Sequence, residues 1–423
     1  MNLNDTKAIA LLDCNNFYVS AESIFKPTLK NKPVVVLSNN DGCVVSRSNE
    51  AREFIAMGAP FFQIEEVLAE NGGVALSSNY ELYGDMSRRI MNTLRAYSPE
   101  VEVYSVDEAF LGLAETRKSF DYVGREIREK IDKYFGIPVG VGIAETKTLA
   151  KIANRIAKKS EKAKGVLDLY QSPYTDIALE RTKVGDVWEV GRATIEKVAP
   201  LGVVTALDFK RLDLRWVKKN LTVKGGRTLL ELRGFRCFPL ELDPPPRKNT
   251  CSSGSFGETV SGYHELYNAV STHLDTAAAR IRKHRLAARA VSVFVETNRF
   301  QPENYYADSF TYKSHYPSDN LFELQEWARI CFDRIYKENF QYKKVGVILE
   351  GLMPTEGITN RLYDSTPQKE KLDRLNRAVD ELNKKFGRGT VHLAAAKIGK
   401  WKMRREMMSR RYTTRLDEVI TLR

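Results

Sequence analysis

Three acidic residues in the first part of the chain have the type and spacing for metal-assisted chemistry. Asp13 ends the apolar run 8–12, and Asp107 with Glu108 lies on a polar turn between two apolar segments. Adjacent carboxylates repel each other, so both remain ionised at little cost only when they are exposed to water or share a divalent cation. Carboxylates that converge at strand ends would hold two Mg²⁺ ions about 3.5–4 Å apart. A solvated turn without function is the alternative that residue type alone leaves open.

The histidines and cysteines exclude other kinds of site. All five histidines lie at or after His264, so a histidine-assisted nucleophile is excluded from the first 263 residues. Chemistry there must therefore use carboxylates, hydroxyl groups or bound metal. The five cysteines show no C-x-x-C spacing. That absence argues against a zinc knuckle and a disulfide framework, and it favours a reducing cytosol.

A helix predicted over 148–159 carries a stripe of positive charge. At 100° per residue, its apolar residues cover one side, and four cations fall within an arc of roughly 80° on the opposite side. These cations are Lys147, Lys151, Arg155 and Lys158. The stripe is either a solvated face or a guide for phosphate groups. A Walker phosphate loop is excluded, because Glu145 stands where that motif requires its second glycine.

The elements that must position these residues predict an α+β protein. In the first 175 residues, short apolar runs that read as strands alternate with helical patterns, among them helices at 49–57 and 120–135. Residues 176–240 are mostly helical and include a helix-hairpin-helix pattern at 187–203, which offers backbone N–H groups to phosphates. The length of 423 residues fits two to four domains.

Three consecutive prolines at 244–246 mark a linker, because proline continues neither a helix nor a central strand. Beyond the linker, the order β-α-β-β-α-β predicts a ferredoxin-like unit of about a hundred residues. The tail from residue 354 contains one further helix, over 366–386, with an apolar stripe. Its stripe consists of Leu372, Leu375, Val379, Leu382 and Phe386.

The charge is unevenly distributed and favours a polyanionic partner. The net charge of +12 divides into −1 for residues 1–175, +5 for 176–353 and +8 for 354–423. A basic second half suits nucleic acid or an anionic lipid surface. No run reaches the roughly 18 apolar residues that a bilayer span needs, and acids interrupt the N-terminal run that a signal peptide requires. We therefore expect no membrane segment and a cytoplasmic protein.

Six motifs, taken together, resemble the Y-family of translesion DNA polymerases. The chain carries DCNNFY (13–18), YSVDEAF (104–110) and VGVGIAETKTLAKIANRIAK (139–158), in the order of the three metal and nucleotide motifs of that family. SNNDGCVVSRSNEAR (38–52), SSNYELYGDMSRR (77–89) and RYTTR (411–415) resemble its branch that acts in SOS mutagenesis. The similarity covers nearly the whole chain.

The resemblance implies a right-hand polymerase fold with palm, fingers, thumb and little finger. The palm, which is ferredoxin-like, would comprise 1–25 and 80–175, and small fingers would comprise 26–79. The helical thumb with its helix-hairpin-helix would be 176–243. The little finger would be 244–353, and 354–423 would be a partner-binding tail.

The resemblance also assigns site residues. It implies that Asp13, Asp107 and Glu108 are catalytic and hold two Mg²⁺ ions, with the backbone carbonyl of Cys14 as a further ligand. Tyr18 would be the steric gate against a ribose 2′-hydroxyl. Arg52 and Lys158 would contact the triphosphate, and Val45 would cover the nascent base pair. Asn49 departs from the family, many of whose members carry a tyrosine there that also contacts the triphosphate.

The implied function is error-prone, template-directed DNA synthesis past lesions in the bacterial SOS response, at the nucleoid. Its substrates would be primer-template DNA and dNTPs, and its partners a UmuD′-type dimer and RecA. A sliding-clamp peptide would fall at Thr359–Tyr363, where the glutamine of the usual motif is missing. A non-catalytic damage-response scaffold is one alternative, and a nucleotidyl cyclase or nuclease with a similar palm is another. The intact acids argue against the scaffold, and the basic second half argues against the other enzymes.

Overall fold

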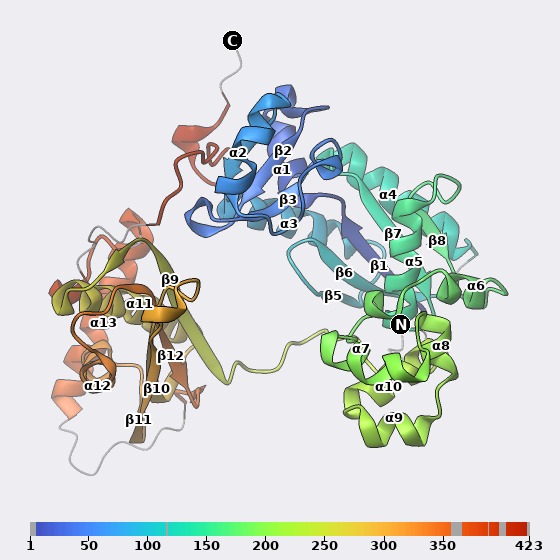
Figure 1. Cartoon of the computed structure of the whole chain (residues 1–423). Helices are drawn as coiled ribbons and strands as arrows, with labels where there is room; N and C mark the ends of the chain where they lie inside the picture. Colours follow the sequence, from blue (N-terminus) through green and yellow to red (C-terminus); the bar gives the residue numbers. More distant parts are fainter. Residues whose placement is uncertain (1–5, 116, 357–365, 388, 397–402, 421–423) are drawn as a thin grey trace. The chain divides into compact units, whose positions relative to one another are not determined.

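The computed structural model in Figure 1 describes residues 6–115, 117–356, 366–387, 389–396 and 403–420. The chain forms two compact units. Unit 1 comprises Met1–Ser38, Gly42–Pro244 and Met407–Arg423, and unit 2 comprises Asn39–Asp41 and Pro245–Glu406. In the described ranges, no helix has both the length and the apolar character needed to cross a bilayer.

Unit 1 is built on a five-stranded sheet in the order β5-β6-β1-β7-β8. The strands are β1 (Thr6–Cys14), β5 (Val101–Val103), β6 (Glu108–Ala114), β7 (Val139–Ala144) and β8 (Val166–Asp168). Side chains alternate along β1, so that Ala10 and Leu12 enter one apolar cluster while Ile9 and Leu11 enter another. The central strand is therefore covered on both faces, which explains its continuous apolar run.

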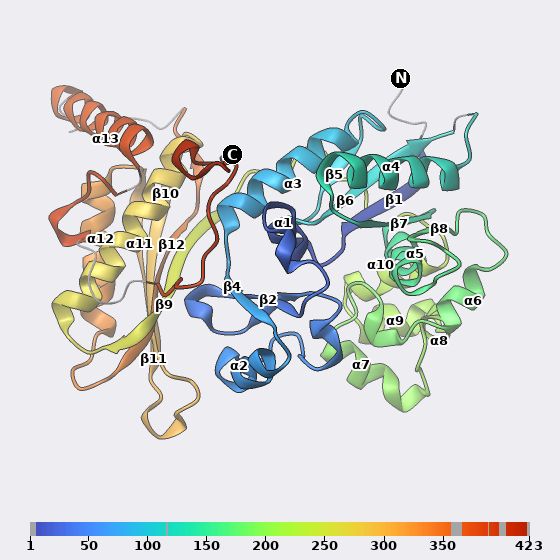
Figure 2. The same cartoon turned by 90° about the horizontal axis from the view of Figure 1, so that it is seen from above.

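Helices from different parts of the chain cover these two faces, as Figure 2 shows. One face packs against α1 (Phe17–Phe25), α3 (Tyr80–Leu94) and α4 (Phe120–Phe135). The other packs against α5 (Lys147–Lys159) and the helical region that follows it. The helix predicted at 120–135 is confirmed at those residues. The helix predicted at 148–159 begins one residue earlier, after Thr146 caps it by accepting a hydrogen bond from the N–H of Leu149 at 3.2 Å.

Two glycines in β7 allow α5 to lie unusually close to the sheet. A Cβ atom on Gly142 would stand 2.1 Å from the backbone nitrogen of Asn154 and 2.3 Å from the carbonyl oxygen of Ala150. A Cβ atom on Gly140 would stand 2.9 Å from the Cγ of Lys158. The amide of Asn154 uses this closeness to donate to the carbonyl oxygen of Gly140 at 2.8 Å. The glycines therefore set how far the α5 side chains reach over the strand ends.

A small three-stranded sheet in the order β3-β2-β4 carries the region predicted to be fingers. It consists of β2 (Val34–Leu37), β3 (Val44–Arg47) and β4 (Val74–Ser77), and α2 (Phe61–Glu70) contributes to its core. The helix predicted at 49–57 is wrong, because only the 3-10 turn Ala51–Glu53 forms there. The backbone instead returns to the sheet: the N–H of Gly58 donates to the carbonyl of Val44 at 2.9 Å.

The predicted thumb region is helical and is tied to α5 by one buried carboxylate. Glu231 is fully buried and accepts hydrogen bonds from the N–H of Thr148 at 3.0 Å and the N–H of Cys237 at 2.7 Å. The hydroxyl of Thr146 donates to the carbonyl oxygen of Glu231 at 3.0 Å. The helices are α6 (Thr175–Glu180), α7 (Arg192–Val198), α8 (Ala206–Arg211), α9 (Leu214–Asn220) and α10 (Val223–Leu232).

Unit 2 has the predicted β-α-β-β-α-β order. Its four-stranded antiparallel sheet runs β11-β10-β12-β9, and the short β13 (Met353–Pro354) pairs with β10. The other elements are β9 (Asn249–Val260), α11 (Tyr263–Lys283), β10 (Leu286–Thr297), β11 (Ala307–Ser318), α12 (Leu321–Ile335) and β12 (Tyr342–Glu350). Residues of both helices and of β9, β10 and β12 share one apolar core.

The tail divides between the two units. Helix α13 (Thr366–Phe386) belongs to unit 2, where the Asp380 carboxylate accepts a bidentate contact from Arg282 of α11 at 2.8 and 2.7 Å. Residues 407–415, which we call the C-terminal segment, belong to unit 1. The N–H of Ser77 in β4 donates to the carbonyl of Met407 at 3.1 Å, and Ser77 forms a parallel bridge with Met408.

Substitution of Gly142 by alanine tests the close approach of α5. We expect Gly142→Ala to lower the free energy of unfolding by about 1–3 kcal/mol, because the added methyl group meets backbone that cannot rotate away. Gly84→Ala in α3 is the matched control, since a Cβ atom there has no neighbour within 4 Å. The control should gain about 0.5–1 kcal/mol from reduced chain entropy. Scanning calorimetry of both variants makes the measurement, and equal melting temperatures would contradict the packing argument.

Candidate active site

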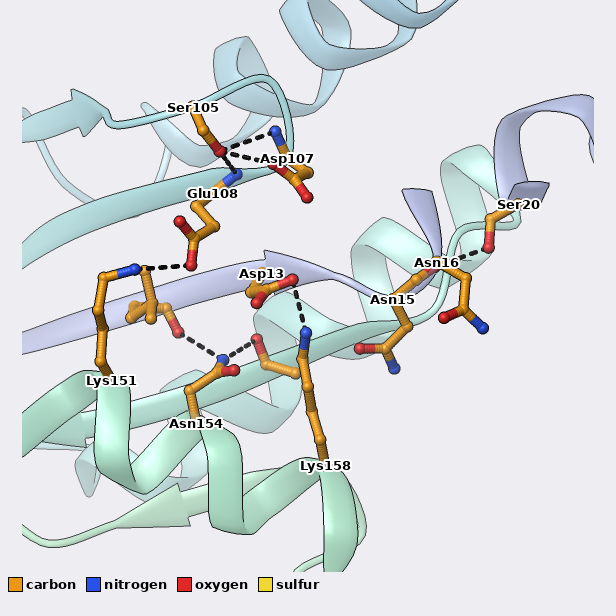
Figure 3. Close-up of polar contacts among 12 residues, drawn as sticks. Asp13, Asn15, Asn16, Ser20, Ser105, Asp107, Glu108, Lys151, Asn154 and Lys158 are labelled. Carbon is orange, nitrogen blue, oxygen red and sulfur yellow. Dashed lines mark hydrogen bonds and ion pairs between the residues drawn. The ribbon is translucent and has the colours of Figure 1, made fainter. Parts of the chain in front are cut away.

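The three acids of the sequence prediction meet at one edge of the unit 1 sheet, as Figure 3 shows. Asp13 lies at the end of β1 and pairs in register with Glu108 at the start of β6 and with Gly140 of β7. Asp107 precedes Glu108 on the β5–β6 turn, and its carbonyl accepts a hydrogen bond from the N–H of Cys14 at 2.9 Å. Strand pairing therefore holds the backbone of all three acids together.

Ser105 shapes the turn that carries two of these acids. Its hydroxyl accepts hydrogen bonds from the N–H of Asp107 at 3.2 Å and the N–H of Glu108 at 2.9 Å, and it donates to the Asp107 carboxylate at 2.6 Å. A serine that bonds to backbone two and three residues ahead favours a turn. Ser105 was not among the predicted site residues, although its position two residues before the acid pair was the available signal.

The basic stripe of α5 is neither a solvated face nor a row of free cations. Each of its four cations is paired with a carboxylate, and two of the partners are predicted metal ligands. Lys158 contacts Asp13 at 2.5 Å, and Lys151 contacts Glu108 at 2.8 Å. The other two pairs are Arg155 with Asp186 at 2.6 Å and Lys147 with Glu102 at 2.5 Å. The helix therefore supplies positive charge to the acidic edge of the sheet.

Burial makes the ionised form of an acid at this edge of the sheet less favourable. Burial raises the pKa of the Asp13 carboxyl, and the charges of Glu108 and Asp107 raise this pKa further, whereas Lys158 lowers it. Burial also raises the pKa of the Cys14 thiol, so this thiol stays protonated and its sulfur is a poor ligand for a metal ion. The carboxylates are therefore stabilised by a cation beside them, and the thiol of Cys14 does not serve as a ligand.

The chemistry of the donors fits a hard divalent cation. Three carboxylates and a backbone carbonyl are oxygen donors, the class that Mg²⁺ and Mn²⁺ prefer. In the conformation described, the ammonium groups of Lys151 and Lys158 stand against two of the carboxylates. Within the described ranges, no three aspartate, glutamate, cysteine or histidine side chains are arranged so that they could already coordinate one metal ion. A divalent ion would therefore have to displace these ammonium groups from the carboxylates.

Tyr18 follows Asp13 by five residues in the sequence and lies within a group of aromatic rings. Its ring stacks on that of Tyr83 with centroids 4.3 Å apart and planes inclined by 13°. Tyr80 meets it edge-on at 5.9 Å, and Phe17 lies at 5.8 Å. The ring of Tyr18 is half-buried, so one part of it remains accessible for contact with a ligand.

The other predicted nucleotide contacts come from the fingers and from α5. Arg52 donates to the side-chain oxygen of Asn16 at 2.8 Å, and the amide of Asn16 donates to that of Asn49 at 3.0 Å. Asn16 adopts a left-handed backbone conformation (φ 48°) directly before α1. Val45 of β3 is partly buried against the same apolar cluster as Tyr18. The residue that replaces the usual tyrosine, Asn49, thus belongs to a polar chain that reaches from Arg52 to the palm.

Models of one protein family match two regions of the chain. Residues 12–155 match the impB/mucB/samB family, and residues 247–362 match the C-terminal domain of that family. Residues 373–422 match a domain of unknown function (DUF4113). The first region contains the acidic edge, and the second contains most of unit 2.

Curated relatives match over almost the full length. Protein UmuC of Salmonella typhimurium is 41% identical over 421 residues, which cover 98% of this chain and 100% of that protein. Protein SamB of Salmonella typhimurium is 37% identical, with 97% and 98% covered. A DNA polymerase IV of Desulfatibacillum aliphaticivorans is 28% identical, with 91% and 95% covered.

Solved structures show the same fold. A chimeric Y-family DNA polymerase matches with a TM-score of 0.64 and 21% identity, covering 82% of this chain and 99% of that one. An insertion ternary complex of Dbh DNA polymerase matches with a TM-score of 0.54 and 19% identity, with the same coverage. These similarities confirm the predicted right-hand polymerase fold.

Proposed function

We propose a reaction and a set of residue roles for this chain from the premise that it belongs to the impB/mucB/samB family. The chain is a Y-family DNA-directed DNA polymerase that performs error-prone translesion synthesis in SOS mutagenesis. It is metal-dependent and binds DNA and dNTPs. Because the matching relatives come from bacteria, we place it in the bacterial cytoplasm, at the nucleoid when it is active.

One observation carries the assignment of the active site. Asp13 and Glu108 are neighbours in register at the end of two central strands, with Asp107 beside them on the turn. Burial and mutual repulsion disfavour such a group of acids, as the raised pKa of Asp13 indicates. Bound cations would stabilise the ionised form of these acids, which indicates that this edge of the sheet is a cation-binding site.

We assign the acids to two Mg²⁺ ions. Asp13, Asp107 and Glu108 would hold the ions together with the carbonyl of Cys14. When bound, the ions supply activation of the primer 3′-hydroxyl and neutralisation of the triphosphate. Lys158, released from Asp13, would then contact the triphosphate together with Arg52. Lys158 and Lys151 thus keep the acids compensated until the metal arrives.

Sugar selection is assigned to Tyr18 and base-pair contact to Val45. The stacked rings of Tyr83 and Tyr18 form an aromatic wall, and the charge of Asp107 acts on Tyr18. A ring fixed in this way excludes an additional hydroxyl group by overlap rather than by a hydrogen bond. Val45 offers an apolar surface from the fingers, which suits the face of a base.

The partners of the chain are proposed from family membership and from the tail. We infer that a UmuD′-type dimer and RecA bind the chain, with the dimer on α13. Leu375, Leu382 and Phe386 of α13 are exposed by 45%, 41% and 62%, whereas Asn376 is buried and Asp380 is tied to Arg282. The helix is therefore held by a polar face, and these three residues of its apolar stripe are exposed. The sliding-clamp peptide predicted at Thr359–Tyr363 lies outside the described residues and remains a proposal.

Neutralising one acid tests the metal assignment. We expect Asp107→Asn or Glu108→Gln to lower the rate of primer extension at least a hundredfold, because an under-coordinated ion loses several kcal/mol of transition-state stabilisation. Affinity for primer-template DNA, measured by fluorescence anisotropy, should stay within about twofold of the unaltered chain. Glu115→Gln, on the same stretch of chain, is the control. A variant that kept a tenth of the original rate would show that the two-metal assignment is wrong.

Truncation of Tyr18 tests the steric gate. We expect Tyr18→Ala to raise ribonucleotide incorporation relative to deoxyribonucleotide incorporation by at least about tenfold, since the clash with the 2′-hydroxyl is removed. Tyr18→Phe keeps the ring and should keep the ratio. Single-turnover assays with matched rNTP and dNTP give the measurement. If Tyr18→Ala leaves the ratio unchanged, Tyr18 is only a packing residue.

The stripe of α13 gives a test of partner binding. We expect the triple variant Leu375→Ala, Leu382→Ala and Phe386→Ala to lose capture of a UmuD′-type dimer by at least about tenfold, because exposed apolar anchors dominate such interfaces. Basal primer extension and melting temperature should remain near those of the unaltered chain. Glu381→Ala, an exposed neighbour outside the stripe, is the control for pull-down and light-scattering assays. Undiminished capture by the triple variant would contradict this docking site.

A further inference from the structure

One buried acid on α1 of unit 1 takes no part in the proposed metal site. Glu22 of α1 is 1% exposed, and its Oε1 accepts two hydrogen bonds. The hydroxyl of Tyr83 in α3 donates at 2.7 Å, and the hydroxyl of Ser409 in the C-terminal segment donates at 2.9 Å. Three distant parts of the sequence therefore meet on one carboxylate oxygen.

This carboxylate is connected to the proposed steric gate through Tyr83. The ring of Tyr83 is fully buried and stacks on the ring of Tyr18 at 4.3 Å. Its hydroxyl is held by Glu22, so the ring cannot shift sideways without breaking that hydrogen bond. The position of the Tyr18 ring thus depends on a surface that Glu22 holds in place.

The pKa shifts of Glu22 and Tyr83 bear on which of the two groups donates in their hydrogen bond. Burial raises the pKa of Glu22, and the hydroxyl groups of Tyr83 and Ser409 lower this pKa. Burial and the neighbouring carboxylate raise the pKa of Tyr83 well above its usual value. Tyr83 therefore remains a donor, and Glu22 depends on both hydroxyl groups for compensation, because a buried carboxylate that loses a donor is destabilised.

The C-terminal segment is anchored on both sides of Ser409. The amide of Asn79, the residue that caps α3, donates to the Ser409 hydroxyl at 2.9 Å and to the carbonyl of Arg410 at 3.1 Å. The ring of Tyr412 stacks on Phe25 of α1 with centroids 4.8 Å apart and planes inclined by 8°. The segment therefore joins the N-terminal end of α3, which carries Tyr83, to the helix that carries Glu22.

We propose that Ser409 is a positioning residue for sugar selection, acting through Glu22 and Tyr83 on Tyr18. The C-terminal segment thereby forms the outer support of the sugar-selecting wall. This inference rests on the proposed role of Tyr18, and it makes the position of the Tyr18 ring depend on a residue that does not contact it. It also assigns a function to part of the region that matches the domain of unknown function.

The test compares Ser409→Ala with two matched variants in the full chain. Steady-state kcat and KM are measured for one dNTP and its matching rNTP, under conditions in which the unaltered chain extends a primer. We expect Ser409→Ala to raise kcat/KM for the rNTP about fivefold and to change that for the dNTP less than about twofold, which corresponds to the loss of one hydrogen bond. Ser409→Thr keeps the donor and should restore the original ratio. Thr414→Ala removes an exposed hydroxyl group from the same segment and should have no effect.

A second variant tests the path from Ser409 to the gate. Tyr83→Phe keeps the stacked ring but removes its hydroxyl, so it should reproduce the change in rNTP discrimination seen for Ser409→Ala. The double variant Ser409→Ala with Tyr83→Phe should show little more than either single change, because both act through Glu22. Additive effects would overturn the shared path. An altered melting temperature with an unaltered rNTP/dNTP ratio in both single variants would overturn the positioning role.

The same assays separate this inference from the gate assignment. If Tyr18→Ala raises rNTP incorporation while Ser409→Ala does not, the gate stands and the role of Ser409 is wrong. If Tyr18→Ala itself leaves the ratio unchanged, the gate assignment is wrong, and the inference falls with it.

Discussion

The acidic edge of the unit 1 sheet depends on how closely α5 approaches β7. Asp13 is largely removed from water, and its carboxyl has a raised pKa even with a lysine beside it. Because Gly140 and Gly142 carry no side chain, α5 lies near enough for Lys158 and Lys151 to reach the acids. A wider separation would leave the carboxylates without compensation at the strand ends, and burial of unpaired charge is costly.

The same helix links the active site to the thumb region. Its first turn is capped by Thr146, whose hydroxyl also reaches the carbonyl of Glu231, and the Glu231 carboxylate accepts from the N–H of Thr148. Nearby, Lys147 and Glu102 form a buried ion pair to which the N–H of Glu241 also donates. A displacement of α5 would therefore disturb the acids and the thumb contacts together. The four cations of α5 are engaged in unit 1, whereas the excess positive charge of the chain lies in residues 176–423.

The two parts of the tail belong to different units. Helix α13 is held to α11 by Arg282 and Asp380, whereas the C-terminal segment lies along β4 and α3 in unit 1. Among the described residues, the region that matches a domain of unknown function, residues 373–422, therefore divides between the two units rather than forming a separate core of its own. Its helix leaves three apolar residues exposed, and its last part contributes Ser409 to the surroundings of Glu22 behind the proposed steric gate.

The sequence alone determined the order of elements and the acids, because these depend on local pattern. Helices Phe120–Phe135 and Thr366–Phe386 follow from apolar periodicity that ends at a glycine. Local pattern failed at 49–57, where helical spacing was outweighed by pairing of the following residues with β3.

Only the tertiary structure decided what the charged and polar side chains contact. From the sequence, the basic stripe of α5 could be interpreted as a solvated face or as a guide for phosphate groups. The periodicity of a helix does not predict which carboxylates lie opposite it in the folded chain. Ser409 is separated from Glu22 by 387 positions, and no periodicity connects residues so far apart. Such contacts arise when separate elements pack around one buried group, which is a property of the folded chain and not of any local segment.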